Sequence, residues 1–176
     1  AALFWKYLAE KFGTSAPGDD VEAGMDVIIK FWEQANADPG YDGIRALNGA
    51  LDELGHSERF RDVWKDFAVA NYAKDLSGPG VPDKYQFEDM GQPGGAYNPV
   101  MLSLNQALAL GAQIVDTDET VRQWGARYYE VQPAADVPFI QVEFTQDTAH
   151  TLYYTVLGVK GTNLAYEYNV EARDLA

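Results

Sequence analysis

The chain has 176 residues, a formal net charge of −14 and no cysteine, and 47% of its residues are hydrophobic. This length suits one ordinary domain or two small ones, and the composition is apolar enough to bury a core. The negative charge repels phosphate groups, which argues against nucleic acid and the anionic face of a membrane as partners. The lack of cysteine excludes disulfides, thiolate zinc sites and a cysteine nucleophile. No apolar stretch is long enough to insert across a bilayer.

Residues 1–73 show the apolar spacing of four short helices. We expect helices over residues 3–12, from a cap at Asp19 or Asp20 to just before Asn36, from Ile44 to Leu54, and from a cap at Ser57 to Tyr72. Their apolar stripes include the aromatic residues Phe4, Trp32, Phe60, Trp64 and Phe67. Short connections favour antiparallel neighbours, so the sequence predicts a small four-helix N-terminal lobe.

Residues 74–98 are rich in proline and glycine, which predicts a connecting segment without regular structure. Tyr85, Phe87 and Met90 lie within it. Apolar side chains need a surface to cover, so we expect this segment to pack against the protein and not to act as a loose linker.

Residues 99–176 alternate between apolar and polar side chains, as strands do. The expected strands are 100–104, 107–115, 121–131, 137–145, 151–159 and 164–171. Short strands at this spacing favour an antiparallel β-sandwich. The predicted fold class is therefore α+β with segregated halves, organised as a helical lobe (1–73), a connecting segment (74–98) and a β-sandwich (99–176).

No complete catalytic site is visible in the sequence. The two histidines, His56 and His150, lie in different halves. We interpret Gly55-His56-Ser57 as a helix stop, a loop residue and a helix cap. The His-Glu-x-x-His zinc motif, the Gly-x-Ser-x-Gly motif and the phosphate-binding loop are absent. We expect no cofactor in this chain and no enzymatic activity from the chain alone.

An acidic turn is the candidate metal site. Asp116, Asp118 and Glu119 lie close together between two predicted strands, and Ca²⁺ binds where several such oxygens converge. Asp38 and Asp42 form a second candidate around a Pro-Gly turn. Neither group has the full spacing of a calcium loop, so a solvated turn is the alternative in both places.

Trp124 and Tyr128 are the candidate ligand-binding residues in the β half. Their spacing would place both on one face of the strand predicted over 121–131. Exposed aromatic rings on a sheet can stack on sugar rings or on a partner protein. The alternative is that these rings fill the core, since tyrosine often occupies half-buried positions.

Two stretches resemble the region that follows the zinc-binding helices in secreted prokaryotic zinc metallopeptidase-like proteins. The first stretch, Ala2–Gly13 followed by Val27–Glu33, has the aromatic-x-x-Tyr-Leu pattern with a closing glycine and then a helix ending in Trp-Glu. Ala46–Gly55 and Phe60–Tyr72 continue this resemblance to the helical lobe. The second stretch, Trp124–Tyr129, is similar to part of the β-sandwich that often follows the lobe.

The resemblance implies that this chain is a non-catalytic C-terminal part of such a protein. The sequence begins inside a predicted helix, at Ala1, without a basic leader or cleavage motif, which agrees with a trimmed piece. The zinc signature would then lie upstream, and the upstream domain would be the main partner. The implied location is extracellular or at the cell surface, and the implied role is to aid stability or substrate docking.

Two other functions remain open from the sequence. One is an extracellular binding module that holds a glycan or a cell-surface partner on the β-sandwich, and an exposed row of aromatic side chains would favour it. The other is a purely structural extracellular domain, which predicts no ligand.

Overall fold

A computed structural model describes residues 2–14, 23–37, 40, 42–74, 76, 80–88, 100–115, 121, 124–143 and 152–172. The chain divides into two compact units, which we call the helical unit (Ala1–Tyr97 with Val159–Ala165) and the β unit (Asn98–Gly158 with Tyr166–Ala176).

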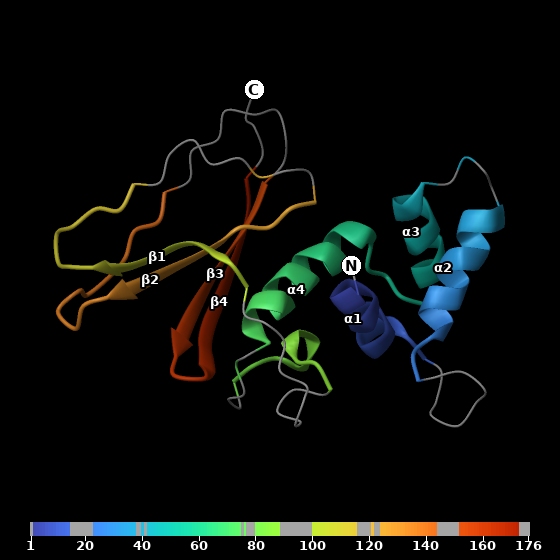
Figure 1. Cartoon of the computed structure of the whole chain (residues 1–176), viewed down its shortest axis with the longest axis horizontal. Helices are drawn as coiled ribbons and strands as arrows, with labels where there is room; N and C mark the ends of the chain where they lie inside the picture. Colours follow the sequence, from blue (N-terminus) through green and yellow to red (C-terminus); the bar gives the residue numbers. More distant parts are fainter. Residues whose placement is uncertain are drawn as a thin grey trace. The chain divides into compact units, whose positions relative to one another are not determined.

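The chain is a mixed α+β protein, as predicted (Figure 1). Its helices are α1 (Ala2–Phe12), α2 (Asp26–Ala37), α3 (Gly43–Glu53) and α4 (Phe60–Ala73), followed by a short 3₁₀ helix, η1 (Asp83–Tyr85). The strands are β1 (Leu102–Leu108), β2 (Tyr128–Pro133), β3 (Leu152–Lys160) and β4 (Asn163–Ala172).

The junction between α1 and α2 is fixed by a close backbone approach. Gly24 has a φ of 77°, and a Cβ at this position would lie 2.1 Å from the Ala9 carbonyl oxygen. Any larger residue would therefore push the two helices apart. The Asp26 carboxylate accepts hydrogen bonds from the Thr14 backbone N–H, at 2.9 Å, and from its hydroxyl, at 2.6 Å. These contacts start α2 at Asp26, so the prediction that this helix begins soon after Asp20 was wrong.

Helices α3 and α4 are bounded by side-chain and backbone caps. Asp42 caps α3 by accepting from the Arg45 backbone N–H at 2.8 Å. Gly55, with a φ of 81°, ends that helix as predicted. The predicted cap of α4 was wrong, because the cap is Arg59 and not Ser57. The Arg59 N–H donates to the Asp62 carboxylate at 3.2 Å. This contact places the cap of α4 two residues after the predicted cap.

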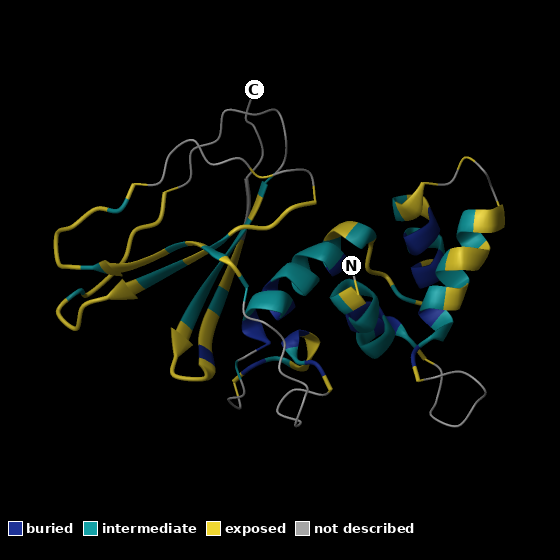
Figure 2. Ribbon diagram, viewed as in Figure 1, coloured by how far each residue is buried: buried dark blue, intermediate teal, exposed yellow. Residues whose placement is uncertain are grey.

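The buried apolar core lies in the helical unit, where Figure 2 shows the buried positions gathered. Its largest fully buried side chains are those of Tyr7, Leu8, Val27, Leu47, Leu51, Val63 and Tyr85. Tyr85 and Phe87 come from the connecting segment and are 0% and 3% exposed. The prediction that this segment packs against the protein is thus confirmed for both residues, whereas Met90 lies outside the described residues.

The described strands form two separate two-stranded sheets, β1–β2 and β3–β4. β3 and β4 are joined by a two-residue turn, which requires an antiparallel pair. β1 and β2, in contrast, pair in parallel, so the antiparallel prediction was wrong for this sheet. The long connection 109–127 permits parallel pairing because it carries the chain back to the starting edge.

Of two predicted strands, 107–115 forms only at residues 107 and 108, within β1, and 137–145 does not form in its described part, residues 137–143. Residues 109–115 leave the sheet because Gly111 adopts a φ of 74° and Ala112 bonds back to Ala109 in a turn. Residues 137–143 follow another turn, closed by the Val137 N–H and the Ala134 carbonyl, and lack strand pairing. The complete β-sandwich remains a prediction.

Candidate interaction surface on the helical unit

Seven aromatic side chains from three helices form one connected group, which we call the aromatic surface. Its members are Phe4 and Trp5 of α1, Phe31 and Trp32 of α2, and Phe60, Trp64 and Phe67 of α4. The α4 members recur at three- and four-residue spacing, which places them on one helix face. All seven belong to the helical unit, so their arrangement is set within one compact body.

The rings touch one another without a break. Phe4 is the centre, with its ring centroid 5.1 Å from that of Phe67 and 5.3 Å from that of Trp64. On the other side, Trp5 lies 5.0 Å from Phe31, which lies 5.2 Å from Trp32. The contacts are tilted or edge-to-face, the arrangements that aromatic quadrupoles favour. The group is therefore an ordered surface and not a set of scattered exposed rings.

Tyr7 joins this surface to the core. Its ring is 1% exposed and lies 5.6 Å from Phe67 and 6.0 Å from Phe87. Burial raises the pKa of the Tyr7 phenol well above its usual range, and the negative charge of Asp66 raises it further. The phenol thus stays neutral at ordinary pH, and its ring packs against Phe67 of the aromatic surface.

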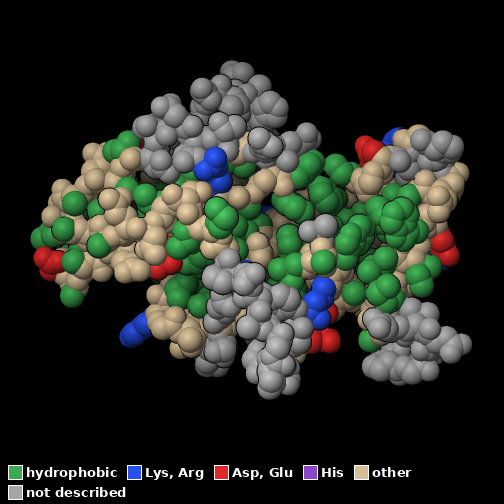
Figure 3. Space-filling model, in the orientation of Figure 1, with side chains coloured by type: hydrophobic (Ala, Val, Ile, Leu, Met, Phe, Trp, Pro, Cys, Tyr) green, Lys and Arg blue, Asp and Glu red, His purple; other side chains and the backbone are tan. Residues whose placement is uncertain are grey.

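Six of the seven rings are half-buried and the seventh, Trp32, is exposed, although all are large and apolar. Trp32 is 57% exposed, and its neighbour Ile29 on α2 is 42% exposed. Figure 3 shows hydrophobic side chains gathered on the visible face over the helices. Contiguous apolar surface of this kind marks an interaction site more often than single exposed residues do. Tryptophan, tyrosine and phenylalanine are also the side chains most enriched in protein interfaces.

The side chains that α2 and α4 bury fully are smaller than these rings. α2 buries Val27, and α4 buries Val63, Val69, Ala70 and Ala73. The paired aromatics could have indicated this arrangement. Consecutive helical residues point about 100° apart, so Phe31 and Trp32 cannot both face one narrow core.

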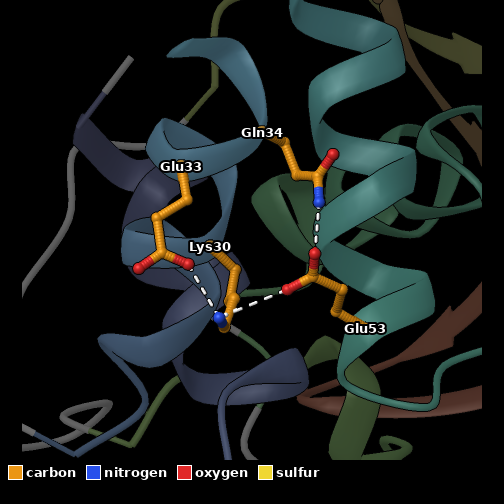
Figure 4. A network of polar contacts seen from close by, with 4 residues as sticks. All are labelled: Lys30, Glu33, Gln34 and Glu53. Atoms are coloured by element: carbon orange, nitrogen blue, oxygen red, sulfur yellow. Dashed lines mark hydrogen bonds and ion pairs between the residues drawn. The ribbon is translucent and has the colours of Figure 1, made fainter. Parts of the chain in front are cut away.

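A polar network between α2 and α3 is the main titratable cluster on the helical unit (Figure 4). Lys30 Nζ lies 2.7 Å from Glu33 Oε2 and 3.3 Å from Glu53 Oε2, and Gln34 donates to the other oxygen of Glu53. The hydrogen bond to Glu33, followed by that to Glu53, raises the pKa of Lys30. Lys30 thus stays charged at ordinary pH, and the network links α2 with α3.

A second charged pair lies on the inner side of α1. The Glu10 side chain is 7% exposed, and its Oε1 forms an ion pair with Lys6 Nζ at 2.7 Å. Its other oxygen accepts from the Glu88 backbone N–H at 3.2 Å. Glu10 thereby ties η1 and its following residues to α1, which is a structural role.

His56 is a structural residue in the described geometry. Its Nε2 lies 2.7 Å from the carbonyl oxygen of Phe12, and the two rings meet edge to face at 5.3 Å. That carbonyl is at the end of α1, where helix carbonyls lack partners within the helix. The expectation that His56 occupies a loop after Gly55 is confirmed, and its link to α1 could not be predicted from spacing.

The candidate metal residues are not brought together within the described ranges. Asp116, Asp118 and Glu119 lie outside them, as do Asp38 and His150, so those predictions are untested. Asp42 is described, and its carboxylate caps α3. No three His, Cys, Asp or Glu side chains converge on a common point among the residues that the structure places.

Trp124 and Tyr128 occupy different settings. Trp124 is 41% exposed and lies in a turn with a φ of 57°, a strained value for a bulky residue. Tyr128 opens β2 and is half-buried. The prediction that both share a strand face was therefore wrong. In the described part of the β unit no aromatic side chain is fully buried, although Tyr128 and Tyr154 are half-buried.

The chain matches no family model, no curated protein and no solved structure among those with which it was compared. In the described part of the chain, no helix has the length and apolar character needed to cross a bilayer.

Proposed function

We propose that this chain is a non-catalytic docking region, which binds another protein domain through the aromatic surface. The observation that carries the proposal is that seven rings form one connected series of contacts, in which six are half-buried and Trp32 is exposed. Rings already held by one another lose little conformational freedom when a partner covers them, which favours association.

The partner that we propose is the domain encoded directly upstream of Ala1. The resemblance of Ala2–Gly13 and Val27–Glu33 to the lobe of secreted prokaryotic zinc metallopeptidase-like proteins supports this choice. In that setting, the helical bundle would pack beside a zinc domain outside the cell. The zinc chemistry would belong to the upstream domain.

The β unit would be an accessory module in the same protein. The proposal that it forms a β-sandwich is supported by the strand-like alternation of residues 99–176. The chain's net charge of −14 is compatible with an extracellular or cell-surface location, because it maintains solubility.

Binding of the separately expressed upstream domain to this chain, measured by calorimetry, tests the proposal. We expect Trp5→Ala with Trp32→Ala to weaken binding by about thirtyfold or more, because tryptophans at an interface centre commonly contribute at least 2 kcal/mol. Trp124→Ala is the matched control, since it removes a tryptophan of the β unit, and it should leave the affinity unchanged. The proposal fails if the two proteins do not bind, or if all variants bind equally.

A further inference from the structure

Hairpin β3–β4 carries a second, different aromatic feature. Tyr166 and Tyr168 of β4 are 61% and 65% exposed. Residues two apart on a strand point to the same face, so the two rings lie side by side along one face of the hairpin. Both belong to the β unit, and neither is part of the aromatic surface of the helices.

Gly158 of β3 holds the Tyr166 ring flat. A Cβ at Gly158 would lie 2.0 Å from Tyr166 Cε1 and 2.4 Å from each of the neighbouring Cδ1 and Cζ. A point beyond the ring edge would be much closer to one carbon than to its two neighbours. The similar distances therefore place the glycine under the face of the ring. One face of Tyr166 is thus against the backbone, and its exposure comes from the other face and the edges.

A flat ring with an open face is a stacking platform, and nucleobases and sugar rings are two classes of ligand that stack on such platforms. The charge of the β half distinguishes between these two classes of ligand. Residues 99–176 contain ten acidic and four basic side chains, a net charge of −6, within a chain of net charge −14. Nucleic-acid platforms combine aromatic rings with a positive groove for the phosphates, which this half lacks. The same charge disfavours polysaccharides that carry carboxylates or sulfates.

We propose that Tyr166 and Tyr168, with Gly158 beneath the first ring, form a binding site for a neutral polysaccharide. Adjacent sugar rings of one chain would stack on the two tyrosines. The site does not depend on docking by the helical unit, because it uses residues of the β unit alone.

Electrophoresis of the full chain in native gels tests this site, with hydroxyethyl cellulose, galactomannan or laminarin as neutral probes and polygalacturonate as the anionic comparison. We expect at least one neutral probe to retard the protein and polygalacturonate to have no effect. Tyr166→Ala and Tyr168→Ala should each weaken retardation about tenfold, because one stacked ring accounts for roughly that factor in affinity. Tyr129→Ala, which removes a tyrosine 40% exposed on β2, should change nothing.

Two further variants separate stacking from folding. Tyr166→Phe with Tyr168→Phe keeps both rings and should retain binding. Gly158→Ala keeps both tyrosines but displaces the Tyr166 ring, so it should weaken binding about as much as Tyr166→Ala. The proposal is overturned if no neutral probe retards the chain, or if the alanine variants bind as the wild type does. It is also overturned if the tyrosines instead mediate self-association, which sedimentation velocity would reveal as a dimer lost in the alanine variants.

Discussion

The two units differ in how they use apolar side chains. Every buried apolar residue that the structure describes lies in the helical unit, including Leu164 at the hairpin tip. Most of the exposed large apolar side chains that the structure describes lie in the β unit. Among them, Met101, Phe139 and Tyr168 are 91%, 77% and 65% exposed. The helical unit thus has a core that can stabilise it and an ordered aromatic surface left over. The described part of the β unit presents many of its apolar residues to solvent.

The largest expected effect comes from opening the helical core. Leu51→Ala removes a side chain that is 0% exposed and should lower the free energy of unfolding by about 2–5 kcal/mol. Leu110→Ala is the matched control, because Leu110 is 61% exposed in the β unit and should change stability by less than about 0.5 kcal/mol. Denaturant unfolding followed by the helical circular dichroism signal measures both. If the two substitutions lower the free energy of unfolding equally, the claim that the units differ in their buried cores is wrong.

Alkaline pH should weaken the helical unit through Tyr7. The folded state keeps this phenol protonated, while the unfolded chain releases the proton above about pH 10. Because the folded pKa is raised, stability is full below pH 10 and falls as pH rises above it, by up to about 1.4 kcal/mol per pH unit. Tyr7→Phe should make the unfolding free energy less dependent on pH in this range. If the unfolding free energies of the wild type and of Tyr7→Phe depend on pH equally, the phenol is not buried as described.

A smaller effect is expected at the start of α3. Asp42→Ala removes the acceptor for the Arg45 N–H and should destabilise the helical unit by about 1 kcal/mol. Asp136→Ala, an exposed aspartate in a turn of the β unit, is the comparison. Thermal unfolding should show a lower midpoint for the first variant alone. If Asp42→Ala has no effect while calcium binding is lost, the residue serves the predicted metal site instead of the helix.

The smallest effect should come from the network around Lys30. Its ammonium group lies at an exposed position between Glu33 and Glu53, where solvent screens the charges. Lys30→Met should therefore leave the unfolding midpoint nearly unchanged at moderate salt. A large loss of stability would show that this network, and not the apolar core, holds α2 against α3.

The helices could be predicted because each combines apolar periodicity with local stop residues such as Gly13 and Gly55. The start of α2 could not, because it depends on Gly24 approaching Ala9, a contact between segments distant in sequence. The parallel pairing of β1 with β2 could not be predicted either, because the alternation of side chains identifies a strand but not the strand that pairs with it.

The sequence showed the aromatic residues of both candidate surfaces, but it could not predict that they lie together on a surface. Periodicity assigns large apolar residues to a core by default, and it cannot show that the seven rings are not fully buried while alanines such as Ala46, Ala50 and Ala70 are. The stacked arrangement of Tyr166 on Gly158 depends on cross-strand contact, which a single sequence does not encode in any local pattern.

Hydroxyl-radical footprinting of the four tryptophans tests the proposed docking function most directly. The chain should be labelled alone and again within a polypeptide that also carries the upstream domain that we propose. We predict that Trp5, Trp32 and Trp64 become protected in the longer protein, while Trp124 is labelled equally in both. Unchanged labelling of Trp5, Trp32 and Trp64 in the longer protein would contradict the proposal that the aromatic surface is a docking surface.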